Sequence, residues 1–242
     1  MIIELVSQHA GKTADNRLKH VIQIINNSTA DLIMFAGHSL IRKNDVTELK
    51  RSLKNKKCSV LFETKEGGNH LYRIEDGKVI DMNTHQVFSQ SKEVNKAPEK
   101  AEFLIDELES HRCFEVLGQK CLVLQCGELN ILKNYQAEGN CVAFRFDNNP
   151  ALEKRFFNLL SHVNIILNPI HLPMGNQGKL SKRRYLLSSD GRAYFSACNA
   201  ETASSLSLKQ KSLQYALVNG EDKPATDSVL FGKSYIIRTF EL

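Results

Sequence analysis

The stretch "CFEVLGQKCLVLQCGELNIL", residues 113–132, decides the fold, because it holds two apolar runs joined by a turn and ends the second run at a single cysteine. The pattern predicts a β-hairpin whose second strand runs to Cys126. A cysteine at a strand end, followed by glycine and a carboxylate, allows two interpretations: an exposed nucleophile or a buried structural thiol. These residues alone leave both open.

The segments before the hairpin predict strands that alternate with helices. Residues 2–7, "IIELVS", form a short apolar run, and apolar residues then recur at helical spacing between residues 15 and 27. The wholly apolar "LIMF" at 32–35 is typical of a central strand covered on both faces. A strand, helix and strand in this order favour a parallel pair with a right-handed crossover.

The same alternation continues along the chain. A helix is predicted in 44–53 and a strand in 59–63, followed by "LYRIEDGKVIDM" at 71–82, whose Asp-Gly pair is a strong hairpin signal. The polar residues 86–100 contain a proline and predict a surface loop.

Later segments complete an α/β pattern. Residues 150–163 predict a helix that begins at proline, and "NIILNP" at 164–169 predicts a buried strand. A further hairpin is predicted in 185–199, "YLLSSDGRAYFSACN".

Composition places the chain among soluble globular proteins. Its 242 residues, of which 42% are hydrophobic and 24% charged, are expected to form a single domain, 1–242. No apolar stretch approaches the roughly 20 residues of a membrane helix, and the N-terminus lacks the features of a secretory signal. We therefore expect no membrane contact and a cytoplasmic location.

The six cysteines are scattered and include no C-x-x-C pair, which argues against disulfides and zinc. The histidines likewise show no metal-ligand spacing, so we expect neither metal nor cofactor. The net charge of +5 is only mildly basic, and its one dense cluster is "GKLSKRR" at 178–184. Such a run usually forms a solvated face, so nucleic acid is not the expected partner. Binding of a phosphorylated partner there stays open.

The order of these segments resembles the nitrilase, or carbon–nitrogen hydrolase, superfamily over most of the chain. The resemblance implies a four-layer α-β-β-α sandwich and a homodimer. Active members of that superfamily use a glutamate as base, a lysine that stabilises the tetrahedral intermediate, and a cysteine that attacks an amide or nitrile carbon. A thiol near its usual pKa of about 8.5 needs such activation at neutral pH.

Part of this machinery is present by resemblance. "VLQCGEL" places Cys126 as nucleophile, with Gly127 offering its backbone to an oxyanion hole and Glu128 in the acidic position. "APEKAEF" places Glu99 as the superfamily's second glutamate. "ILNPIHLP" is similar to the segment that closes the other side of the pocket, and its candidate pocket residues are Asn168, Pro169 and His171.

The other two catalytic positions are replaced. After "ADLIMF" the superfamily pattern has proline and glutamate, whereas this chain has Ala36 and Gly37, followed by His38. The position expected to be lysine is His85. Lys92 and Lys96 lie nearby in sequence, and the sequence does not decide whether either substitutes for it.

Two functions remain. A missing general base costs a few orders of magnitude in rate, and a missing oxyanion cation adds about two to three more. These losses favour a catalytically silent binding or assembly domain, with or without a small amide-like ligand. The alternative is an amidase-type hydrolase that acts through a Cys126 thioester, assisted by His85 and Glu99 as a Cys-His-Glu site.

Overall fold

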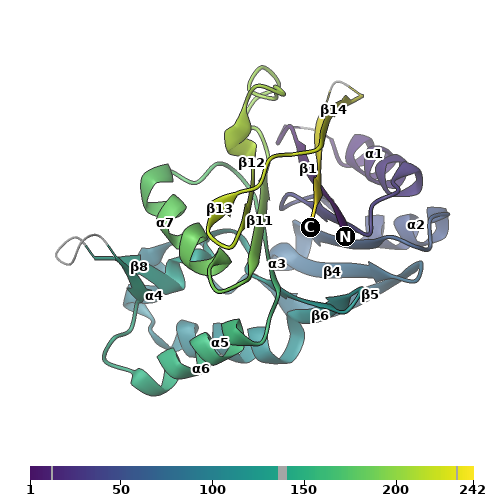
Figure 1. The fold of residues 1–242 in the computed structure, drawn as a ribbon. Helices are drawn as coiled ribbons and strands as arrows, with labels where there is room; N and C mark the ends of the chain where they lie inside the picture. The colour runs from purple at the N-terminus through teal and green to yellow at the C-terminus, as the bar shows by residue number, and fades with distance from the viewer. Residues whose placement is uncertain (12, 136–140, 233) are drawn as a thin grey trace.

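Two large β-sheets face each other, and helices cover their outer faces (Figure 1). The computed structural model describes residues 1–11, 13–135, 141–232 and 234–242. The first sheet has the strand order β14-β15-β1-β2-β3-β4-β5. Its strands are β1 (Ile2–Gln8), β2 (Leu32–Phe35), β3 (Ser59–Thr64), β4 (His70–Glu75), β5 (Lys78–His85), β14 (Asp227–Phe231) and β15 (Tyr235–Glu241).

The second sheet has the order β13-β12-β11-β10-β7-β6, and a separate pair is formed by β8 and β9. These strands are β6 (Cys113–Val116), β7 (Gln119–Val123), β8 (Leu132–Asn134), β9 (Val142–Phe144), β10 (Ile165–Ile170), β11 (Ala193–Cys198), β12 (Gln214–Val218) and β13 (Glu221–Asp222). The helices are α1 (Ala14–Asn27), α2 (Asn44–Ser52), α3 (Glu66–Asn69), α4 (Ser91–Lys96), α5 (Glu99–His111), α6 (Pro150–Ser161) and α7 (Gln177–Ser188), with 3₁₀ turns η1 (Cys126–Ile131) and η2 (Lys211–Leu213).

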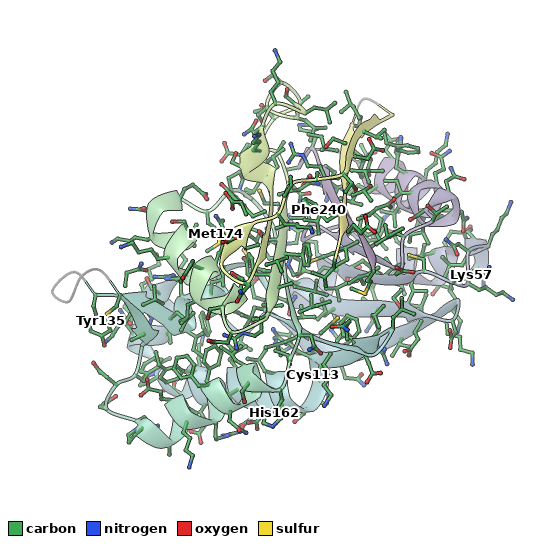
Figure 2. All side chains as sticks on the ribbon, viewed as in Figure 1. Lys57, Cys113, Tyr135, His162, Met174 and Phe240 are labelled. Carbon is green, nitrogen blue, oxygen red and sulfur yellow. The ribbon has the colours of Figure 1, made fainter. Side chains whose placement is uncertain are left out.

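Alternating side chains of the strands build the layers. In β2, Leu32 and Met34 enter the core between the two sheets, whereas Ile33 and Phe35 pack beneath α1 and α2. This two-residue period follows from the pleat of a strand. The layer between the sheets includes Phe240, labelled in Figure 2. The predicted four-layer α-β-β-α sandwich is therefore confirmed.

The second sheet is covered by α5, α6 and α7. Leu104, Phe156 and Leu187 come from these three helices and share one buried cluster with Ile166 of β10. Figure 1 shows the three helices on the side of the molecule opposite to α1 and α2. The central strands β2, β10 and β11 are thus buried on both faces, which explains why they are nearly continuous apolar runs.

Two predicted segments are wrong in detail. The expected surface loop at 86–100 contains α4, because the Glu93 carboxylate accepts hydrogen bonds from backbone N–H groups at its start and Val94 is buried beneath it. The first half of the expected hairpin at 185–199 belongs to α7, which buries Leu180 and Leu187 two turns apart. Tertiary burial decided both segments.

Candidate active site

The carboxyl ends of four strands meet in one place. They are β2 and β3 of the first sheet and β7 and β10 of the second. Strands β1, β2 and β3 run parallel in the first sheet, and β7, β10 and β11 run parallel in the second. The Gly37 N–H, just after β2, donates to the carbonyl of Ile170 at the end of β10 across 3.1 Å. Since ligands of parallel sheets bind at the carboxyl ends of strands, this junction is the natural position for a site.

Cys126 occupies a strained turn at this junction. Strand β7 ends at Val123, so the predicted strand stops three residues early, and Cys126 begins the turn η1 with a φ of 42°. A positive φ at a non-glycine residue costs about 1–3 kcal/mol, and such strain clusters at functional sites. The Asn168 amide donates to the Cys126 carbonyl across 3.3 Å and so fixes the turn. Cys126 itself is partly exposed.

Gly127 is required by a close approach of the backbone. A Cβ atom at this position would lie 1.7 Å from the carbonyl oxygen of Ser89. The segment after β5 therefore lies directly against the turn that carries Cys126.

His171, directly after β10, connects Cys126 to a buried carboxylate. Its Nε2 lies 2.9 Å from Oε2 of Glu63, and its side chain also hydrogen-bonds with Cys126. The three side chains form a cysteine, histidine and carboxylate chain of the kind that activates nucleophiles in unrelated folds.

Glu63 is wholly buried, and every hydrogen bond recorded for its carboxylate comes from the site. Its Oε1 accepts from Gln125 Nε2 at 2.8 Å, and its Oε2 accepts from the His38 backbone N–H at 3.1 Å as well as meeting His171. Burial alone would raise the pKa of Glu63, but the hydrogen bond and charge of His171 and the amide of Gln125 lower it below its usual value. Glu63 is therefore an anion at neutral pH.

The pKa of His171 moves in the opposite direction. Burial lowers the pKa of the imidazole, but hydrogen bonds with Cys126 and Glu63 and the charges of both groups outweigh burial and raise the pKa to about 10. His171 is therefore an imidazolium at neutral pH, held between the Glu63 carboxylate and the Cys126 side chain. A cation beside the sulfur promotes the nucleophilic form of cysteine.

The side chains of His171 and Glu63 occupy the space beside Gly37. A Cβ atom on Gly37 would lie 2.2 Å from His171 Cδ2 and 2.9 Å from Glu63 Oε2. The glycine is therefore needed for these two side chains to meet. The carboxylate beside it comes from the neighbouring strand β3.

His38 covers the imidazole of His171. The two rings stack with centroids 3.8 Å apart and planes 11° from parallel, and His38 Nε2 lies 2.7 Å from the Asn69 side-chain oxygen. Burial and then the charge of His171 lower the pKa of His38 to about 4. His38 is therefore a neutral ring that covers a charged one. Both rings line a cavity of about 400 Å³.

The contacts of Glu128 stabilise the backbone around Cys126. It is fully buried, forms an ion pair with the buried Arg112, and accepts the backbone N–H groups of Val87 at 2.8 Å and Gln125 at 2.7 Å. Burial raises the pKa of Glu128, and Arg112 opposes that effect. Glu128 holds the strand end before Cys126 in place.

The structure does not bring the other predicted catalytic residues to the thiol. The His85 side chain is exposed, and its backbone carbonyl accepts from Arg112 at 2.7 Å. Glu99 is exposed at the start of α5, and Lys92 and Lys96 are exposed on α4. Within the described part of the chain, no recorded hydrogen bond or ion pair joins any of these four to Cys126.

The remaining pocket predictions are placed as follows. Asn168 and Pro169 belong to the buried strand β10, whereas His171 follows its end. Sequence reasoning missed Glu63 altogether. Its signal was a carboxylate at the end of the apolar run "SVLFE", at a position where the pleat points inward between the two sheets.

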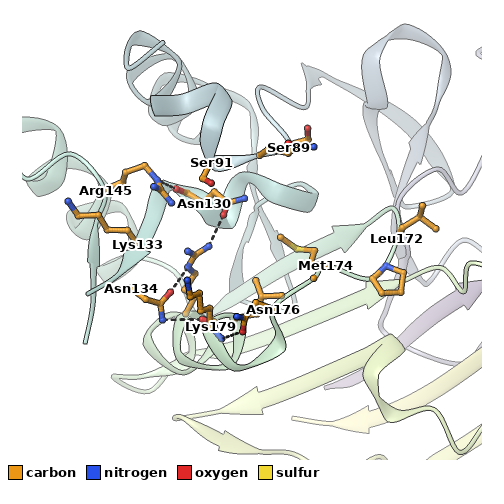
Figure 3. A pocket seen from close by; sticks show the side chains of 15 residues that line it. Ser89, Ser91, Asn130, Lys133, Asn134, Arg145, Leu172, Met174, Asn176 and Lys179 are labelled. Carbon is orange, nitrogen blue, oxygen red and sulfur yellow. Dashed lines mark hydrogen bonds between the residues drawn. The ribbon is translucent and has the colours of Figure 1, made fainter. Parts of the chain in front are cut away.

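A second cavity, of about 630 Å³, opens at the other end of η1. It is lined mainly by polar and basic side chains, among them Asn130, Arg145 and Arg183 (Figure 3). Leu172, the residue after His171, lines both cavities. Within residues 1–11, 13–135, 141–232 and 234–242, no group of three or more His, Cys, Asp and Glu side chains is arranged to hold a metal ion.

Solved structures share this architecture. An amidase from Nesterenkonia sp. AN1 superposes with a TM-score of 0.58 at 11% sequence identity, over 100% of this chain and 92% of that one. A carbon–nitrogen hydrolase superfamily protein from Xanthomonas campestris gives 0.54 at 11% identity, over 100% and 90%. The chain has the nitrilase, or carbon–nitrogen hydrolase, fold. The resemblance seen in the sequence is therefore confirmed at the level of the fold.

A larger protein contains the same fold as one part. The glutamine-dependent NAD⁺ synthetase from Acinetobacter baumannii superposes with a TM-score of 0.53 at 16% identity, over 100% of this chain and 46% of that one. No family model and no curated protein matches the sequence. In the described residues, no helix has both the length and the apolar character needed to cross a bilayer.

Proposed function

We propose that this protein is a cysteine hydrolase of small amides, with Cys126 as nucleophile, His171 as proton carrier and Glu63 as the carboxylate that orients the imidazole. The observation that carries the proposal is the hydrogen-bonded chain from the thiol through His171 to the buried Glu63. The amide class is supported by solved structures of the same fold, one of which is an amidase in complex with butyramide.

The chemistry runs through a thioester. The Cys126 thiolate attacks the amide carbonyl carbon, and the carbonyl electron pair moves to oxygen. The His171 imidazolium then gives its proton to the nitrogen, the carbon–nitrogen bond breaks, and ammonia or an amine leaves. Water attacks the thioester while neutral His171 takes its proton. The carbon–sulfur bond then breaks, the carboxylic acid leaves, and the Cys126 thiolate and the His171 imidazolium are restored.

Two features support the transition states. Glu63 stabilises the imidazolium throughout, since its Oε2 holds Nε2 and fixes the tautomer. The proposed donor for the developing oxyanion, which a cysteine site of this kind requires, is the backbone N–H of Gly127, because the next N–H, that of Glu128, already donates to the Gln125 carbonyl at 2.9 Å. The buried hydrogen bonds of Asn168 and Glu128 keep that turn rigid.

This proposal differs from the silent-domain interpretation that the sequence favoured. The silent-domain interpretation assumed that the catalytic base had been lost at Gly37 without a substitute. Glu63 and His171 fill the space beside Gly37, which supplies both a carboxylate and a proton carrier. The silent binding domain stays the second candidate, because a single imidazole must do the work of two groups.

The test is the reactivity of the thiol together with turnover. Alkylation of Cys126 by iodoacetamide, followed by peptide mass analysis between pH 5 and pH 9, is expected to show a thiolate well below pH 8. The exposed Cys141 serves as the reference within the same molecule. Release of ammonia from butyramide is expected in the parent protein and is expected to vanish in Cys126→Ala.

The variants separate the two candidates. His171→Ala is expected to return Cys126 to ordinary thiol reactivity, whereas the matched change of the exposed His162 to Ala leaves it unchanged. An ordinary thiol in the parent protein and no amide turnover would reject the hydrolase and leave the silent domain. Folding of each variant is checked by circular dichroism.

A further inference from the structure

The cavity beside η1 contains two guanidinium groups for which the described residues record no carboxylate partner. Arg183 is only 7% exposed, and its Nε and Nη1 donate to the side-chain oxygens of Asn134 and Asn130 at 3.0 and 2.8 Å. Arg145 is half-buried and donates to the carbonyls of Asn130 and Leu132 and to an amide oxygen. All of these acceptors are neutral.

These positive charges lie close enough to repel each other. Burial and then the charge of Arg145 lower the pKa of Arg183 to about 10. Burying two like charges without an anion is costly, and neutral side chains would satisfy the same acceptors. The arrangement is expected only where an anion enters the cavity.

The other charged residues that line the cavity are also positive. None of the fifteen described residues that line the cavity is an aspartate or glutamate. Lys179 is exposed on its rim, at the start of α7, whose first turn has no acidic residue. Lys133 also lines the cavity, but it is already paired with Asp147 at 3.1 Å. Figure 3 shows dashed lines from Asn130 and Asn134 to one guanidinium inside this hollow.

The cavity lies beside the turn that carries the thiol, because Asn130 of η1 lines it. The Asn130 amide donates to the Gly127 carbonyl at 2.7 Å, so the residue that holds Arg183 also holds the turn of Cys126. Cys126 and Asn130 stand four residues apart in η1, which at the rise of a 3₁₀ helix separates them by about 8 Å. Met174 lines the cavity and packs against the same buried cluster as Cys126.

We propose that this cavity binds an anionic group, and that the substrate is a small amide that carries a carboxylate or phosphate several bonds from its scissile carbonyl. Arg183 and Arg145 bind the anion, whereas the amide end reaches Cys126 past Leu172 and Met174. The identity of the substrate rests on the proposed hydrolase function, whereas the anion site does not depend on turnover. Bidentate guanidinium contacts suit both oxyanions.

The first arm of the experiment measures binding without catalysis. Calorimetry with inorganic phosphate and with succinate, at constant ionic strength, is expected to show saturable binding to the full chain. Arg183→Gln and Arg145→Gln are each expected to weaken it at least about tenfold, since each removes a charge-assisted contact. The exposed Lys154 lies outside the cavity, so Lys154→Gln is the matched loss of one charge and leaves binding unchanged.

The second arm compares two amides of equal chain length, neutral butyramide and anionic succinamate. Succinamate is expected to be preferred in kcat/KM, and Arg183→Gln is expected to reduce that preference at least about tenfold. Lys179→Gln, on the exposed rim, tests the same site with little risk to folding and is expected to weaken phosphate and succinate binding by a smaller factor.

The outcomes separate the two proposals. Binding of phosphate or succinate that depends on Arg183, without turnover of either amide, supports the anion site and rejects the hydrolase. Equal turnover of both amides, with no saturable binding of either anion, rejects the anion site and supports the hydrolase. A preference for phosphate over succinate, or the reverse, identifies which oxyanion the site takes.

Discussion

Two kinds of buried charge lie at opposite ends of one short turn. Around Cys126, each buried charge has its counter-charge, because Arg112 meets Glu128 and His171 meets Glu63. Beyond Asn130, the acceptors recorded for Arg183 and Arg145 among the described residues are all neutral. Paired charges hold a structure together, whereas unpaired ones raise its free energy until a ligand arrives.

The largest expected effect comes from breaking the most buried pair. Glu128→Gln leaves the Arg112 guanidinium without a counter-charge at zero exposure, and is expected to cost about 3–5 kcal/mol of unfolding free energy. Urea denaturation measures this cost. The double change Arg112→Met with Glu128→Leu removes both charges and is expected to recover part of it. A loss below about 1 kcal/mol for the single variant would show that the pair is not structural.

The second effect comes from the catalytic pair. Glu63→Gln keeps the shape of the side chain but removes the charge that holds the imidazolium, and is expected to lower kcat for butyramide by at least about a hundredfold. Because the raised pKa of His171 depends in part on Glu63, the pH at which Cys126 becomes reactive toward iodoacetamide is also expected to change. An unchanged pH profile would assign Glu63 to structure alone.

The third effect concerns the ring that stays neutral. The pKa of His38 is lowered from 6.5 to about 4. Burial lowers it most, and the groups that also act on it are His171, Glu63, Asn69 and Lys65. The unfolded state binds more protons than the folded state between these two pH values, so stability falls as pH decreases from about 6.5 to 4. The loss is expected to be about 1–2 kcal/mol after discounting for solvent screening.

His38→Gln is expected to flatten this part of the stability curve, measured by urea unfolding at pH 7 and pH 4.5. The exposed His111 provides the control, since His111→Gln leaves the curve unchanged. If His38→Gln loses as much stability between pH 7 and pH 4.5 as the parent protein, the loss does not come from His38.

The smallest expected effect is the most informative for the comparison between paired and unpaired buried charges. Arg183→Gln is expected to change the unfolding free energy in anion-free buffer by less than about 1 kcal/mol, because relief of repulsion offsets two lost hydrogen bonds. Addition of succinate is expected to stabilise the parent protein and not the variant, as followed by thermal unfolding. A loss as large as that of Glu128→Gln would place Arg183 among the structural charges.

Sequence predicted much of the fold because its signals are local. The apolar run of β2, the Asp-Gly turn between β4 and β5 and the proline at the start of α6 each depend on a few neighbouring residues. The nucleophile candidate Cys126 was found in the same way. The "GKLSKRR" cluster was noticed but misinterpreted as a solvated face, since Arg183 and Arg184 are buried.

The pairing of distant residues could not be predicted in this way. Cys126, His171 and Glu63 come from three strands of two sheets, and Glu63 and His171 stand 108 positions apart. Only the packing of one sheet on the other brings the three together beside Gly37. The homodimer implied by the resemblance stays a prediction.

The sequence by itself determined the alternation of helices and buried strands, the strand that leads to Cys126, and the absence of a carboxylate at Gly37, because these follow from local periodicity and residue type. The tertiary structure alone decided which carboxylate and which imidazole meet the thiol, and which arginines lack a counter-charge. A charge's partner depends on distance through space, and a one-dimensional pattern does not contain that distance.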